Sequence, residues 1–81
     1  MTVTIIDYGV GNLGSIQNML KRLGSQSVIA SDESTIDRAT KIFLPGVGAF
    51  DEGMRQLNQS GLRQSLDYAV LQRKVPVVGI C

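Results

Sequence analysis

Cys81 is the residue of this sequence best suited to chemistry, because it is the only cysteine and a thiolate is a strong nucleophile. It directly follows the apolar run Val77–Ile80, which predicts a buried strand with a thiol at its tip. Where such a strand turns sharply into a helix, the side chain at the turn projects above the sheet edge, and the helix N-terminus favours the thiolate. The alternative is a structural cysteine, since free cysteines are often buried.

The segment Pro45-Gly46-Val47-Gly48 is the second candidate for chemistry. It ends an apolar run and is rich in glycine, which allows unusual backbone angles. Such a loop can turn backbone N–H groups toward the carbonyl oxygen of a substrate held at a thiol, as an oxyanion hole requires. The alternative is a turn that only ends a strand. The loop and the thiol together make a stronger case than either alone.

The elements that must position these residues alternate between strands and helices along the chain. The expected strands are Val3–Asp7, Ser27–Ala30, Lys41–Leu44 and Val75–Ile80, and the expected helical segments are Leu13–Leu23, Thr35–Ala39, Asp51–Leu57 and Leu62–Arg73. The strands are apolar runs without polar alternation, which indicates an open parallel sheet with helices on both faces. We therefore predict an α/β fold with the flavodoxin-like strand order 2-1-3-4.

The predicted topology brings the candidate residues together. Right-handed crossovers place the carboxyl ends of all parallel strands on one edge of the sheet, where open α/β sheets bind ligands. Asp7–Asn12, Pro45–Phe50 and Cys81 should meet there. Within the first helix, Asn12 is a suitable N-cap and Gly24 a suitable C-terminal glycine. One apolar stripe is expected from Ile16, Met19, Leu20 and Leu23.

Composition excludes several classes of function. The net charge of +1 is spread along the chain, so no basic stripe predicts a nucleic-acid partner. No apolar run approaches the roughly 20 residues of a membrane span, and the first residues lack a signal-peptide pattern, so we expect a cytoplasmic protein. One cysteine and no histidine exclude a disulfide and a zinc site. Because Val77–Ile80 should be an interior strand, we expect residues 1–81 to be the N-terminal part of one longer domain.

A dinucleotide fingerprint is the strongest competing pattern. Gly9–Gly14 is a literal G-x-G-x-x-G between a strand and a helix, and Asp32 follows near the spacing of a ribose-binding carboxylate. A Rossmann-like binding module is therefore one hypothesis. Asp7 and Tyr8 weigh against it, because they crowd the turn and a carboxylate opposes a pyrophosphate. The alternative for these glycines is a tight turn that lets the helix pack closely.

Three motifs together resemble a known family. Asp7–Leu13, Leu44–Phe50 and Val78–Cys81 are similar to the class I (triad) glutamine amidotransferases, and more narrowly to the glutaminase subunits of imidazole glycerol phosphate synthase in histidine biosynthesis. The resemblance spans the whole chain in register. It implies that Cys81 attacks the side-chain amide of L-glutamine, forming a glutamyl thioester and releasing ammonia without a cofactor. It also places Gly46, Val47 and Gly48 in the oxyanion loop and at the substrate.

The resemblance further implies a partner subunit, a cyclase with a (β/α)8 barrel that receives the ammonia. Tyr8, Gly9, Gly11 and Asn12 would then lie at the partner interface. The catalytic His and Glu of the family lie downstream, so residues 1–81 alone are expected to be inactive. A paralogous glutaminase that serves amination of a surface sugar would carry the same motifs, and this alternative stays open.

Overall fold

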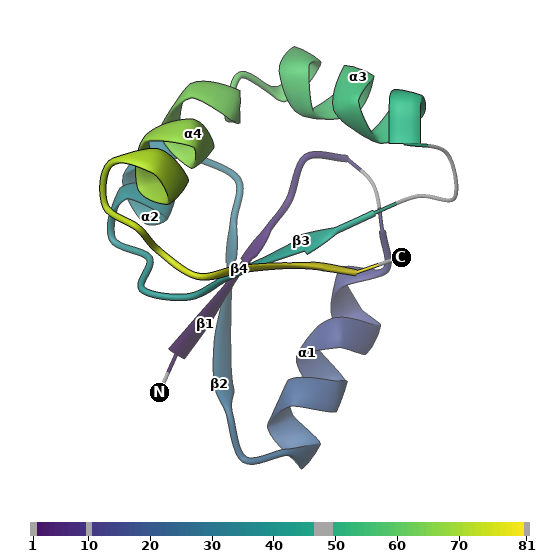
Figure 1. The fold of residues 1–81 in the computed structure, drawn as a ribbon. Helices are drawn as coiled ribbons and strands as arrows, with labels where there is room; N and C mark the ends of the chain where they lie inside the picture. Colours follow the sequence, from purple (N-terminus) through teal and green to yellow (C-terminus); the bar gives the residue numbers. More distant parts are fainter. Residues whose placement is uncertain (1, 10, 47–49, 81) are drawn as a thin grey trace.

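The computed structural model of the protein describes residues 2–9, 11–46 and 50–80. Their strands are β1 (Thr2–Ile6), β2 (Gln26–Ala30), β3 (Ile42–Pro45) and β4 (Val77–Ile80), and their helices are α1 (Leu13–Arg22), α2 (Glu33–Asp37), α3 (Phe50–Ser60) and α4 (Arg63–Leu71). The strands form one parallel sheet in the order β2-β1-β3-β4 (Figure 1). The predicted sheet and its strand order are confirmed.

The two faces of the sheet follow from the alternation of side chains along β1. Val3 and Ile5 face one side, where they pack with Leu20 of α1. Ile6 faces the other side, which is covered by α2, α3 and α4. In the described part of the chain, α1 therefore covers one face and α2, α3 and α4 cover the other, as the unbroken apolar runs predicted (Figure 1).

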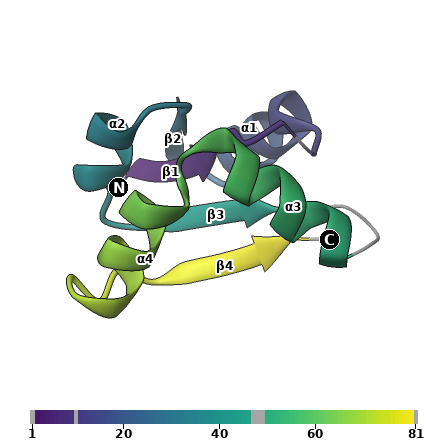
Figure 2. The same ribbon diagram turned by 90° about the horizontal axis from the view of Figure 1, so that it is seen from above.

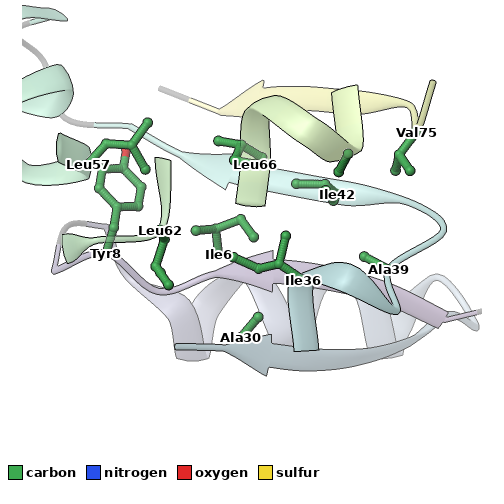
Figure 3. Packing of buried hydrophobic residues seen from close by; sticks show 11 residues of the cluster. Ile6, Tyr8, Ala30, Ile36, Ala39, Ile42, Leu57, Leu62, Leu66 and Val75 are labelled. Atoms are coloured by element: carbon green, nitrogen blue, oxygen red, sulfur yellow. The ribbon is translucent and has the colours of Figure 1, made fainter. Parts of the chain in front are cut away.

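The larger apolar cluster lies between the sheet and the three helices (Figure 3). Its centre is aliphatic: Ile6 and Ile36 are fully buried, and Ile42 is 1% exposed. The buried members of this cluster are Ile6, Tyr8, Ala30, Ile36, Ala39, Ile42, Leu57, Leu62, Leu66, Ala69 and Val75. Among these described members Tyr8 is the one aromatic residue, and it lies just beyond the end of β1.

Helix α1 begins where the sequence predicts and ends one residue early, at Arg22. The side chain of Asn12 accepts a hydrogen bond from the Ser15 backbone N–H at 3.1 Å, and Gly24 has a φ of +83°. The predicted apolar stripe is only partly correct. Leu20 is buried, but Met19 is 45% and Leu23 is 73% exposed. Leu23 is the C-cap residue, where the chain already leaves the helical path.

Other boundaries differ from prediction by a few residues. The sequence predicted a break from Asn58 to Gly61, but helix α3 continues through Ser60. The polar residues before Gly61 stay helical, and the helix ends at Gly61, whose φ is +79°. Strand β4 begins at Val77 rather than Val75, and α2 starts two residues early at Glu33. Across residues 2–9, 11–46 and 50–80, no helix combines the length and apolar character needed to cross a bilayer.

Candidate active site at the carboxyl edge of the sheet

The register of the sheet brings the ends of three strands together. Ile5 of β1 lies beside Phe43 of β3, and Pro45 at the end of β3 lies beside Ile80 at the end of β4. All three strands point the same way, toward the side where α3 begins (Figure 2). This edge is where a doubly wound sheet offers a ligand site.

The residues predicted to carry the reaction follow the ends of β3 and β4 in the sequence. Cys81 directly follows Ile80, and Val47 and Gly48 follow Gly46. Cys81, Val47 and Gly48 lie outside the described residues, so their roles stay predictions. Gly46 is described, and it is half-buried immediately after β3.

The turn after β1 lies at the same edge of the sheet, next to the end of β3. Gly9 and Gly11 have φ values of +96° and +89°, which only glycine adopts readily. Gly9, Gly11 and Asn12 are exposed, whereas Tyr8 is buried. The Asp7 carboxylate accepts a hydrogen bond from the Gly9 N–H at 3.3 Å. The partner interface at this turn stays a prediction. Of its predicted residues, Gly9, Gly11 and Asn12 are exposed and accessible to a partner.

Tyr8 has a contact that the sequence did not reveal. Its side chain is 7% exposed, and its hydroxyl donates a hydrogen bond to the backbone carbonyl of Pro45. Burial raises the pKa of this hydroxyl above its usual range, so it stays protonated and able to donate. Gly11 touches the same proline, because a Cβ built on Gly11 would lie 2.6 Å from the Pro45 Cβ. The turn after β1 is thus fastened to the end of β3.

Comparison with known proteins gives a consistent result. The chain is 49% identical over 79 residues to the imidazole glycerol phosphate synthase subunit HisH 2 of Methanococcus maripaludis. It is 47% identical to subunit HisH 2 of Pseudomonas aeruginosa and 49% identical to subunit HisH of Bdellovibrio bacteriovorus, each over 79 residues. Each match covers 98% of this chain. No family model matches the sequence.

The chain is homologous to the N-terminal part of HisH. It spans 39% of the length of these curated relatives. The resemblance found in the three motifs is therefore confirmed at the level of the family.

The geometry of the glycine-rich turn differs from that of a dinucleotide site. In a dinucleotide site the second glycine lets the pyrophosphate approach and the third lets the helix pack closely. Here the space beside Gly11 is filled by Pro45. The nearest atom to a Cβ on Gly14 would be Asn12 Oδ1 at 3.8 Å, an ordinary contact, so this position does not require glycine.

Asp32, the candidate ribose ligand, is also engaged locally. It is the N-cap residue of α2, and its Oδ2 accepts a hydrogen bond from the Ser34 hydroxyl at 2.8 Å. Hydrogen bonds from Thr35 and then Ser34 lower the pKa of this carboxyl. These local hydrogen bonds account for an aspartate at position 32, so no bound nucleotide is needed to explain it.

We expect the full-length protein to bind NAD or FAD no better than background. The Asp7 carboxylate uses the Gly9 amide, and Pro45 blocks the approach at Gly11. Isothermal titration calorimetry checks this. A dissociation constant in the micromolar range, about −8 kcal/mol, would contradict it and favour the binding module.

Proposed function

We propose that this chain is the nucleophile-bearing N-terminal part of a glutamine amidotransferase. The full-length protein would hydrolyse L-glutamine to glutamate and ammonia, and pass the ammonia to a cyclase subunit with a (β/α)8 barrel. The two subunits would form a cytoplasmic heterodimer that makes imidazole glycerol phosphate. The names of the relatives, which are subunits of imidazole glycerol phosphate synthase, support this pathway over the amination of a surface sugar.

The observation that carries the proposal is the pairing of Pro45 with Ile80. Each of these residues is followed in sequence by a group that the reaction needs. Gly46 begins the glycine-rich loop after Pro45, and Cys81 follows Ile80. This register supports the proposal, because the segments that would hold the nucleophile and its candidate oxyanion loop follow the ends of two neighbouring strands.

The proposed reaction uses the Cys81 thiolate and the loop that begins at Gly46 in its first step. The Cys81 thiolate attacks the side-chain amide carbon of glutamine, and the carbonyl oxygen becomes an oxyanion that backbone N–H groups of the Gly46–Gly48 loop stabilise. The carbon–nitrogen bond then breaks, and the nitrogen takes a proton and leaves as ammonia. Water hydrolyses the remaining thioester to glutamate and restores the thiol. The base for these steps would come from the His and Glu beyond residue 81.

A glutamine analogue that bears a diazo ketone is expected to label the full-length protein once, at Cys81. The analogue mimics the substrate and alkylates the attacking sulfur. Peptide mass spectrometry identifies the labelled residue, and glutamate release from L-glutamine measures the reaction itself. Labelling should be faster with the cyclase bound. Absence of glutamate release, or labelling of another residue only, would contradict the proposal.

A separate experiment distinguishes histidine biosynthesis from the amination of a surface sugar. With the cyclase of histidine biosynthesis as partner, glutamine should support formation of imidazole glycerol phosphate. Synthesis only with a sugar-modifying partner would instead favour the paralogous glutaminase.

A further inference from the structure

Tyr8 is placed so that one atom of its side chain reaches the start of the candidate oxyanion loop. The ring is held in the larger apolar cluster, where Figure 3 shows it beside Leu57 of α3. Its hydroxyl donates to the Pro45 carbonyl, the last backbone carbonyl before Gly46. With the ring fixed by packing, the position of the hydroxyl is fixed as well.

The orientation of the Pro45 carbonyl decides how the chain leaves β3. The proline ring locks φ, so ψ is the remaining soft backbone torsion at this residue. Because the peptide unit is planar and trans, the Gly46 N–H points opposite to the Pro45 carbonyl. A hydrogen bond that holds this carbonyl therefore also sets the direction of the Gly46 N–H.

A second contact restrains the same residue from another side. The backbone of Gly11 approaches the Pro45 ring so closely that a Cβ there would lie 2.6 Å from the Pro45 Cβ. The carbonyl of Pro45 is thus held by Tyr8, and its ring lies against Gly11. Both restraints come from the turn after β1, more than 30 residues earlier in the chain.

We propose that Tyr8 is a positioning residue for glutamine hydrolysis: its hydroxyl orients the Pro45–Gly46 peptide and thereby the Gly46 N–H, the first candidate backbone donor of the loop that begins there. The inference rests on the proposed function, because the loop stabilises an oxyanion only if the protein hydrolyses an amide. Tyr8 touches neither substrate nor nucleophile in this scheme, and it acts through the backbone of Pro45.

The test is the variant Tyr8→Phe in the full-length protein with its cyclase. The change keeps the ring in the core and removes only the hydroxyl. Loss of a single oxyanion donor costs about 10²–10³ in rate, and a misaligned loop should lose part of this, about tenfold in kcat for glutamine hydrolysis. KM for glutamine should change little, since an interaction made only in the transition state lowers kcat and kcat/KM equally.

The matched control is Tyr68→Phe, which removes a hydroxyl from a tyrosine of α4 that is 57% exposed. It should keep wild-type kcat and KM. If Tyr8→Phe also kept the wild-type kcat, or only lowered the melting temperature, Tyr8 would be structural and the inference wrong.

A second measurement does not depend on activity. The amide resonance of Gly46 in a ¹H–¹⁵N spectrum should shift in Tyr8→Phe and stay in place in Tyr68→Phe. An unmoved Gly46 resonance would overturn the inference even if Tyr8→Phe were inactive. A wild-type protein that released no glutamate would instead overturn the proposed function, so the two failures are distinguishable.

Discussion

Replacing Cys81 with serine in the full-length protein is expected to abolish glutamine-dependent synthesis by the complex while ammonia-dependent synthesis continues. A hydroxyl without a strong base is a far weaker nucleophile than a thiolate, so the thioester would not form. Ammonia supplied from outside bypasses that step. The measurement is the rate of product formation by the cyclase with either nitrogen source, compared between the variant and the wild type.

The control for this experiment is Tyr68→Phe, which changes a side chain of α4 that is 57% exposed and lies outside the three motifs. It should retain both activities, because it removes a single hydroxyl away from the carboxyl edge of the sheet. If Cys81→Ser kept full glutaminase activity, or lost ammonia-dependent synthesis to the same degree, the cysteine would be a structural residue.

Replacing Gly11 with alanine is expected to destabilise the protein far more than replacing Gly24 with alanine. The two glycines have similar φ values, +89° and +83°, so a side chain at either one costs about 1–2 kcal/mol of backbone strain. Gly24 has open space around it, whereas a Cβ on Gly11 meets Pro45 at 2.6 Å. Overpacking of this kind adds about 1–3 kcal/mol.

Urea unfolding of the full-length variants measures this difference, as a lower midpoint at an unchanged slope. Gly11→Ala should also reduce glutamine hydrolysis, because relief of the clash must move Pro45 or the turn after β1. Equal destabilisation by the two substitutions would show that the contact between Gly11 and Pro45 is not tight in solution.

The sheet was predictable because each of its determinants is local. The run Val3–Ile6 has apolar side chains on both faces, and so do Ile42–Leu44 and Val75–Ile80. This distinguishes strands that are buried between two helical layers from half-exposed ones. The glycine at position 24 and the cap at Asn12 mark the ends of α1 in the same local way. Strand order then followed from the short, right-handed connections.

The role of Tyr8 was not predictable in this way. Its partner, Pro45, lies 37 residues along the chain, and no short pattern links the two. From the sequence, Tyr8 was predicted to lie in the turn after the first strand and to contact the partner subunit. Its burial arises because Leu57 of α3 and the end of β3 both close over the turn after β1, and that depends on the assembled fold. The exposure of Met19 and Leu23 likewise depends on what covers α1.

The strand order has a consequence for synthesis on the ribosome. β2 pairs with β1, β3 also pairs with β1 on its other side, and β4 pairs with β3. When β2, β3 or β4 emerges from the ribosomal exit tunnel, a strand that it pairs with has thus already left, since translation proceeds from the N-terminus. The sheet can grow outward from β1 without waiting for later residues. The segment that leads into Cys81 is then the last of the four strands to be added, onto an edge that is already built.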